Sequence, residues 1–299
     1  FPKKIYAFVA GNALSIGLIG AVTAGPPLRL LMDIFAWRLV ISVTGVMTLV
    51  LGCVIWLVVR DSPQEKGYTG FTKRISKPAS FSTKRIWQDH FKIFKYRNIW
   101  LLFVIPGGIA GCILSFSGLW GVPYLISHHG LTPARAASLT SVLLIAWAIG
   151  SPFFGWLSDH LRKRKSLYLV GTMVVALGWS LILFRESLSF FQLIMALFVT
   201  GFFSGCIIIS FAFVMESVPL SLSGTAAGLT NMGVMMGPML LQPFVGRILD
   251  YHWTGQMVQG VRIYSLDAYE FGFIPMMVWI IVSVLLLFFT KETNCRQMA

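Results

Sequence analysis

Long stretches without a charged residue make up most of the chain, and short polar segments separate them. A helix needs about 20 predominantly apolar residues to cross the hydrocarbon core of a bilayer. Strands of a membrane barrel would be about 10 residues long and would alternate in polarity, which these stretches do not. The pattern therefore predicts eight transmembrane helices, within residues 5–28, 39–59, 98–134, 136–158, 166–184, 187–215, 217–246 and 271–290.

The composition supports a membrane protein. Of the 299 residues, 56% are hydrophobic and only 12% are charged, and the mean hydropathy is +0.77. Soluble domains carry about 25% charged residues because water must wet their surface. The predicted fold class is therefore an all-α membrane protein.

The basic residues divide unequally between the two sides of the membrane. Residues before the first span, the polar segment 60–97, the loop 159–165 and the C-terminal tail hold 18 of the 24 Lys and Arg. Short basic loops stay in the cytoplasm, so both ends of the chain are expected there. The membrane is expected to be a cell membrane, most simply a bacterial inner membrane. The other six are Arg29, Arg38, Arg135, Arg185, Arg247 and Arg262.

The net charge of +13 is thus mainly a signal of topology. It also favours contact with anionic membrane lipid. A nucleic-acid partner would require a folded basic domain, which the sequence lacks.

The longest polar segment, 61–97, divides the chain into two spans before it and six after it. Ten of the 18 basic residues lie between Arg60 and Arg97, with the turn formers Pro and Gly. In 83–96, Ile86, Phe91, Ile93 and Phe94 alternate with basic residues, as in an amphipathic helix on the inner leaflet. We expect a basic cytoplasmic linker with an amphipathic segment.

An internal similarity explains the unequal division. Shifted by 217 residues, the first span matches the seventh at five of 24 positions, including a Gly, a Pro and the terminal Asp. Carriers are often built from repeats. If the two spans are equivalent, four helices precede this chain. Residues 1–60 are then the last two helices of an N-terminal bundle, and 98–299 form a C-terminal six-helix bundle.

The segment from Gly155 to Lys165 reads GWLSDHLRKRK. It resembles the signature loop of the major facilitator superfamily, in which Gly-x-Leu-Ser-Asp precedes a basic cluster; here Arg162 replaces the usual Gly. Further matches are Gly25-Pro26-Pro27, the junction from Glu216 to Asn231, and Lys291-Glu292-Thr293. The resemblance implies helices five to twelve of a twelve-helix secondary transporter. The segments 119–124 and 242–246 resemble bacterial nutrient carriers of the phagosomal-transporter type.

In that superfamily the second-half signature loop stabilises one access state by contacting the start of the fifth helix. The resemblance therefore implies a cytoplasmic gate in which Asp159 faces that helix start, here next to Lys3 and Lys4. A carboxylate at such a site can face a helix N-terminus and pair with basic side chains. The alternative is a solvated loop that only sets orientation. The expected gate residues are Gly155, Asp159, Arg162, Lys163, Arg164, Glu216, Lys3 and Lys4.

Glu216 is the only charge in its loop. It could neutralise Arg162 or Arg164 at the same surface, or it could be an ordinary exposed acid.

Substrate sites of such carriers lie near the membrane midplane, so polar and aromatic residues at that depth are candidates. Phe116, Trp120 and Tyr124 recur every four residues and are expected to form one aromatic face, although Tyr124 alone would also suit a lipid-facing aromatic belt. Asn231 and Gln242 are eleven residues apart and share a helix face. Asn231 could instead bond a neighbouring helix. The other candidates are Asn12, Ser204 and Trp147.

Arg29 and Asp33 are four residues apart near the outer end of the first span. A local ion pair is the favoured interpretation, and contact with a solute at the outer gate is the alternative. No Asp, Glu, Lys or Arg lies at the centre of a span. A coupling proton would therefore need Asp33 or helices outside this chain.

Three pairs of glycines lie four residues apart, at 201 and 205, 224 and 228, and 233 and 237. Each pair would let another helix approach closely.

The sequence predicts a transporter rather than an enzyme. The five histidines lie in loops or at helix ends, and no zinc-protease, nucleophile or nucleotide-binding motif occurs. We expect no cofactor and no metal, a small organic solute as substrate (an amino acid or similar nutrient, or an organic anion), alternating access, and a monomer. A channel, or a receptor or scaffold that reuses the carrier fold, stays an alternative.

Overall fold

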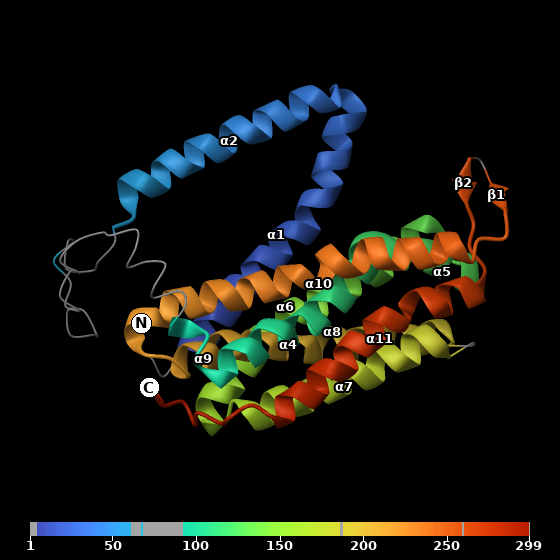
Figure 1. The fold of residues 1–299 in the computed structure, drawn as a ribbon. Coiled ribbons are helices and arrows are strands. Elements are labelled where there is room, and N and C mark those ends of the chain that lie inside the picture. The colour runs from blue at the N-terminus through green and yellow to red at the C-terminus, as the bar shows by residue number, and fades with distance from the viewer. Residues whose placement is uncertain (1–4, 61–66, 68–91, 186–187, 259, 299) are drawn as a thin grey trace.

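The computed structural model describes residues 5–60, 67, 92–185, 188–258 and 260–298, without the side chains of 23–30 and 33. Helices dominate this part of the chain, and one short hairpin is added, so the prediction of an all-α membrane protein is confirmed (Figure 1). The elements are α1 (Tyr6–Ile34), α2 (Trp37–Val58), α4 (Arg97–Ser115), η3 (Phe116–Trp120), α5 (Gly121–His129), α6 (Pro133–Leu161), α7 (Lys165–Phe184), α8 (Phe190–Ser204), η4 (Gly205–Ile208), α9 (Ile209–Glu216), η5 (Leu220–Leu222), α10 (Ser223–Tyr251), β1 (Met257–Val258), β2 (Val261–Arg262) and α11 (Leu266–Phe288).

Seven helical segments of the described chain are long and apolar enough to cross a membrane. Each coincides with a predicted span, because a bilayer requires the same length and apolarity that the sequence pattern displays. The eighth predicted span is α1, a continuous helix of 29 residues, and its stretch Tyr6–Val22, where the side chains are described, is apolar.

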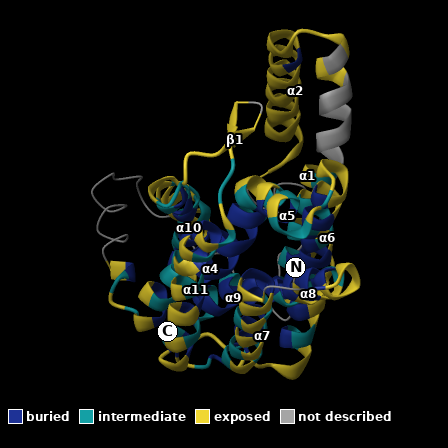
Figure 2. Cartoon of the chain, turned by 90° about the vertical axis from the view of Figure 1, so that its right-hand side faces the viewer, coloured by how far each residue is buried: buried dark blue, intermediate teal, exposed yellow. Residues whose placement is uncertain are grey.

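The six spans from α4 to α11 form a bundle, and α1 joins it by lying along α6 (Figure 1). We call one end of the bundle the tail end, because the α6–α7 loop and the C-terminal segment 289–298 lie there, and the other end the hairpin end, where β1 and β2 lie. By contrast, α2 stands apart from the bundle, and Val40 is its only buried residue (Figure 2). An apolar helix with no packed face requires lipid or other helices around it.

Close backbone contacts at glycines hold the helices of the bundle together. A Cβ atom on Gly233 of α10 would lie 1.8 Å from the carbonyl oxygen of Phe103 in α4, and one on Gly205 would lie 2.2 Å from the backbone of Gly150 in α6. Gly201 and Gly237 are equally close to neighbouring backbone. Two of the three glycine pairs therefore lie at helix crossings, as small residues do in membrane bundles. The third pair, Gly224 and Gly228, faces open space.

Glycines also allow close backbone contact between α1 and α6, which are far apart in the sequence. A Cβ atom on Gly11 would lie 2.7 Å from the carbonyl oxygen of Ser151, and one on Gly155 would lie 2.4 Å from that of Ala7. Ser15 also donates its hydroxyl proton to the carbonyl of Ala148. The first half of α1 is thereby fastened to α6.

The internal similarity extends to the helix boundaries. Both α1 and α10 contain 29 residues, and Tyr6 and Ile34 shifted by 217 fall on the first and last residues of α10. A shared length and register supports two copies of one ancestral helix.

The predicted amphipathic segment 83–96 falls mostly outside the described residues. At its described end, Ile93 is buried in the core of the bundle, while Phe94 packs against Trp100 in a tilted arrangement with ring centroids 4.7 Å apart. The placement of Ile93 on a leaflet surface was therefore wrong, because this side chain packs against protein.

We predict that Gly233→Ala destabilises the bundle, because the added methyl group must separate α10 from the α4 backbone, at a cost of about 1–3 kcal/mol. Thermal unfolding in detergent measures this loss. Gly228→Ala in the same helix is the matched control, since its methyl group meets no described atom and Ala favours a helix over Gly by about 0.5–1 kcal/mol. Equal melting temperatures for the two variants would contradict the packing argument.

Candidate functional site

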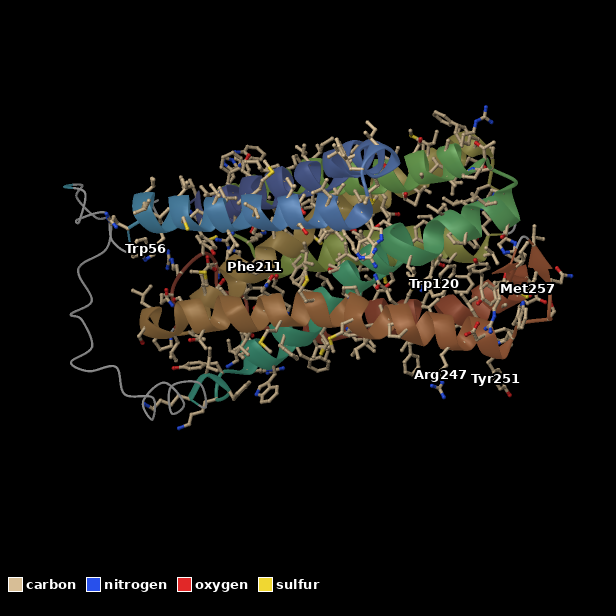
Figure 3. All side chains as sticks on the ribbon, turned by 90° about the horizontal axis from the view of Figure 1, so that it is seen from above. Trp56, Trp120, Phe211, Arg247, Tyr251 and Met257 are labelled. Atoms are coloured by element: carbon tan, nitrogen blue, oxygen red, sulfur yellow. The ribbon has the colours of Figure 1, made fainter. Side chains whose placement is uncertain are left out.

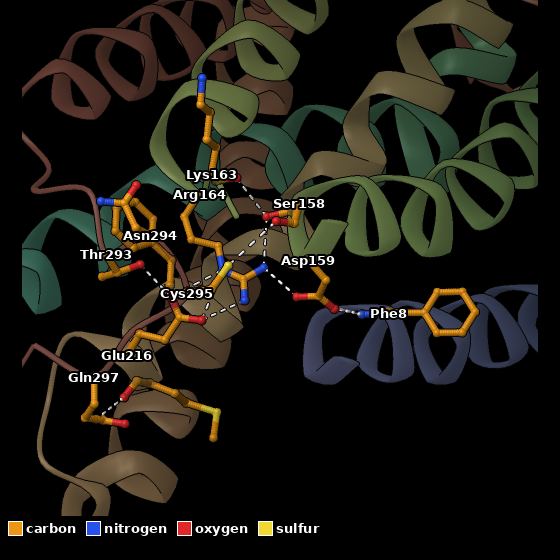
Figure 4. Close-up of polar contacts among 12 residues, drawn as sticks. Phe8, Ser158, Asp159, Lys163, Arg164, Glu216, Thr293, Asn294, Cys295 and Gln297 are labelled. Atoms are coloured by element: carbon orange, nitrogen blue, oxygen red, sulfur yellow. Dashed lines mark hydrogen bonds and ion pairs between the residues drawn. The ribbon is translucent and has the colours of Figure 1, made fainter. Parts of the chain in front are cut away.

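Asp159 connects two segments that are far apart in the sequence. Its Oδ2 accepts a hydrogen bond of 3.1 Å from the backbone N–H of Phe8, in the first turn of α1, across a separation of 151 residues (Figure 4). Its Oδ1 pairs with Nη1 of Arg164 at 2.8 Å. The carboxylate therefore faces the positive end of one helix and a cation at the same time.

Arg164 is the centre of this cluster, and its side chain is 0% exposed. Its Nη1 also donates to Ser158 Oγ at 2.9 Å. On the other side, its Nη2 and Nε donate to the carboxylate of Glu216, at the end of α9, at 2.6 and 3.1 Å. Burial opposes the charged guanidinium, but its hydrogen bonds and charge interactions with Glu216 and its hydrogen bond to Asp159 raise the pKa of Arg164 above its usual value.

The neighbouring basic residues are outside the cluster. Arg162 and Lys163 are exposed, so Glu216 pairs with Arg164 rather than with Arg162. Arg162 has φ +53° at the C-terminal cap of α6, the left-handed conformation that favours glycine. This explains why the superfamily motif usually has Gly at this position. Lys3 and Lys4 lie outside the described residues.

The C-terminal segment closes over the cluster. Glu292 accepts hydrogen bonds from the backbone N–H groups of Arg164 and Lys165, at 2.9 and 2.8 Å, and so caps the N-terminus of α7. Thr293 donates its hydroxyl proton to Glu216 (Figure 4). The Sγ atom of Cys295 lies 3.7 Å from the carbonyl oxygen of Ser158. Burial raises the pKa of this thiol to about 11.

We call Asp159, Arg164, Glu216 and Glu292, together with the first turn of α1, the latch. It joins α1, α6, α7, α9 and the C-terminal segment at the tail end. Four charged groups in such proximity are stable only because each carboxylate has a cation or helix N-terminus to face.

The expected aromatic face is divided by a local change of helix type. Residues Phe116–Trp120 form a π-helical turn, which spaces side chains differently from an α-helix. Phe116 and Tyr124 are buried inside the bundle with Trp179, Phe273 and Tyr269. In this state neither lines an open cavity or faces lipid.

Trp120 points instead toward α10 (Figure 3). Its Nε1 donates to the backbone carbonyl of Gln242 at 3.1 Å, and the Gln242 amide donates to the carbonyl of Leu114 at 3.1 Å. The π-turn and the end of α4 are thus both hydrogen-bonded to Gln242 of α10. Trp120 also lines a cavity of about 820 Å³ beside the hairpin, with Arg262 and Tyr264.

The remaining candidates divide into exposed and buried residues. Asn231 is exposed, and none of the side-chain hydrogen bonds within the described chain involves it. Asn12 is exposed and donates to the carbonyl of Phe8. Ser204 is buried and bonds the carbonyl of Thr200, and Trp147 is buried with an indole N–H that has no partner among the described residues. The side chains of Arg29 and Asp33 are not described.

The Major Facilitator Superfamily profile matches residues 1–241 and, in a second alignment, 115–294. The chain belongs to the Major Facilitator Superfamily. Its fold is similar to a crystal structure of a bacterial homologue of the human lysosomal transporter Spinster, in an inward-facing and unoccupied conformation. That match has a TM-score of 0.53 and 17% identity and covers 95% of this chain and 67% of the other.

Curated relatives are similar to this chain at low sequence identity. Monocarboxylate transporter 12 of Xenopus laevis is 25% identical, over 91% of this chain and 59% of its own length. The lysosomal dipeptide transporter of Danio rerio is 25% identical, over 57% and 32%, and the D-galactonate transporter of Escherichia coli is 23% identical, over 82% and 61%. The chain thus spans 61% or less of these relatives.

Sequence reasoning about this superfamily member missed the C-terminal part of the latch. In the sequence, Lys291 to Thr293 are a family match with no predicted role. The sequence does contain an acid, Glu292, directly after the last span. The backbone N–H groups at the N-terminus of α7 need hydrogen-bond acceptors, and such an acid can supply them. Asn98 was missed as well: its amide bonds Ser217 Oγ and both backbone groups of Lys291.

We predict that Arg164→Gln destabilises the protein by about 3–5 kcal/mol, because Asp159 and Glu216 then keep buried charge without a cation. Chemical or thermal unfolding of the purified protein measures the change. The exposed neighbour provides the control, since Lys163→Gln should stay within about 0.5 kcal/mol of the parent. If both variants unfold alike, the latch contributes no stability.

Proposed function

We propose that the protein is a secondary carrier that moves a small organic solute across a membrane by alternating access, with the latch as its cytoplasmic gate. The observation that carries the proposal is the bond between Asp159 and the first turn of α1. It links a helix that precedes the linker to the bundle that follows it. A carrier needs such a reversible contact between its two halves, because each access state must be stable and yet able to open.

In this proposal the described arrangement is the state closed at the tail end. Gly155 brings the α1 backbone against α6, and Asp159 then adds a charge-assisted hydrogen bond to the helix N-terminus. Opening the tail end breaks this bond and separates the two helices. Arg164 stays paired with Glu216 within the bundle, so its charge is neutralised in both states.

We further propose that the chain supplies helices five to twelve of a twelve-helix carrier, in a monomer. The residues 1–60 would then belong to the first half, 61–97 to the linker and 98–299 to the second half. The exposed α2 supports this assignment, because four further helices would cover its apolar surface.

The basic residues at the tail end support a cytoplasmic location for both ends of the chain, in a cell membrane such as a bacterial inner membrane. A proton is the simplest coupling ion for a symporter of this kind, with Asp33 as a candidate carboxylate.

For the substrate we propose an organic anion or an amino-acid-like nutrient. The relatives' names include a monocarboxylate, a galactonate and a dipeptide transporter. Asn231, Asn12 and Trp120 are candidate contacts, because their side chains are not buried.

The test of transport is substrate counterflow in proteoliposomes that contain the full-length protein, with monocarboxylates, sugar acids and dipeptides as solutes. Saturable uptake that is accelerated by solute on the other side supports a carrier. Ohmic single-channel current would instead establish a channel, and binding without flux would establish a receptor.

We predict that Asp159→Asn lowers counterflow by about 10-fold or more while the protein still inserts, because a charge-assisted hydrogen bond is worth about 1.5–3 kcal/mol. Asn preserves the size of the side chain but presents a donor amide to either Arg164 or the N–H of Phe8. Asp267→Asn is the matched control, since Asp267 is an exposed acid in the first turn of α11 at the other end. Unchanged flux in correctly inserted Asp159→Asn protein would refute the gating role.

A further inference from the structure

A groove runs between α7 and α8 on the surface that faces the membrane. Its volume is about 470 Å³, and its walls include Leu177 and Leu181 from α7 and Phe191, Met195 and Val199 from α8. Leu177 and Phe191 are 70% and 68% exposed. Such apolar exposure within a transmembrane bundle is stable against the hydrocarbon of the bilayer or against another apolar surface, but not against water.

Small residues form the floor of the groove. Gly178 on α7 and Ala196 on α8 both line it, and a Cβ atom on Gly178 would lie 2.1 Å from the Thr200 hydroxyl oxygen. The two helices therefore touch at this level while longer side chains rise on either side. The result is a groove that is open along its length rather than an enclosed cavity.

The length of the groove matches one leaflet. Val174 and Arg185 mark its two ends on the α7 side and are eleven residues apart, which is about 16 Å along a helix. Half the hydrocarbon core is about 15 Å thick. Since α7 ends at Phe184, the groove extends from the middle of the bilayer to the surface at the hairpin end.

The mouth of the groove is its polar part. Arg185 is exposed there, and within the described chain no hydrogen bond or ion pair involves it. Gln192 also lines the groove and uses its Oε1 to accept from the Ser189 N–H, which leaves the amide N–H₂ as a donor. The adjacent residue Glu186 lies outside the described residues. A guanidinium and an amide donor at the end of an apolar groove complement an anionic oxygen cluster attached to a hydrocarbon chain.

We propose that this groove binds one acyl chain of a glycerophospholipid in the leaflet at the hairpin end, with the lipid phosphate on Arg185 and Gln192. Lipid binding at this site requires only that the protein is inserted in a membrane. The proposal is therefore independent of the proposed transport function. A phosphate without acyl chains, or a diacylglycerol without phosphate, would satisfy only one end of it.

A second groove of similar size serves as an internal comparison. It has a volume of about 400 Å³, lies between α10 and α11, and is lined by apolar residues including Leu240, Phe244 and Val278. None of its lining residues is charged. Hydrocarbon alone would occupy both grooves equally, whereas a phosphate-directed site would be confined to the α7–α8 groove.

The test is photocrosslinking of the full-length protein in nanodiscs with a diazirine-labelled phosphatidylglycerol, and mass spectrometry of the labelled peptides. We expect at least fivefold more label on the α7–α8 peptides than on the α10–α11 peptides. A diazirine-labelled diacylglycerol should lose this preference. Arg185→Gln should lower the α7–α8 label at least threefold, and Leu181→Trp, which fills the groove, should do the same with Arg185 intact.

The matched control is Arg247→Gln, because Arg247 is an exposed arginine toward the same end of α10 (Figure 3). It should leave the α7–α8 label unchanged. Equal labelling by phospholipid and diacylglycerol, or equal effects of Arg185→Gln and Arg247→Gln, would each overturn the proposal. Competition by inorganic phosphate in place of lipid would also overturn it.

Discussion

A guanidinium that is removed from water must be matched by carboxylates, and the burial of Arg164 imposes this requirement on the whole tail end of the bundle. Asp159 and Glu216 supply the negative charge from α6 and α9. Each acid then has further partners, so that α1, α6, α7, α9 and the C-terminal segment meet at one point. The stability of this end depends on how those charges are shared.

The two pairs of the latch differ in what they connect. Arg164 and Glu216 lie within one bundle, so their attraction persists through any rigid movement of that bundle. Asp159 also contacts α1, which precedes the linker, and its bond is worth only a few kcal/mol. A contact of that size can hold one state without making it permanent. The glycines at 11 and 155 determine whether this contact can form, because they set how closely α1 approaches α6.

Hydrophobic lengths predicted the spans well, because a bilayer demands apolar residues over a set distance whatever the helices pack against. The 217-residue shift matches only five single residues in the sequence, and the structure adds that α1 and α10 begin and end at equivalent positions. The placement of single side chains was less predictable. An α-helical spacing put Phe116, Trp120 and Tyr124 on one face, whereas the π-turn separates Trp120 from the other two. That turn is stabilised by a hydrogen bond between Trp120 and Gln242, which are 122 residues apart. A local sequence pattern therefore does not predict it.

The sequence by itself determined that this protein is a helical membrane protein of the Major Facilitator Superfamily and that Asp159 lies in its signature loop, since these depend on composition, span length and a local motif. Only the tertiary structure decided which of the clustered basic residues is buried, because Arg162, Lys163 and Arg164 are alike in sequence and differ in direction. It also decided that Glu292 caps α7 and that Glu216 selects Arg164. Such partners are chosen by distance and desolvation, and neither quantity exists until the helices have packed.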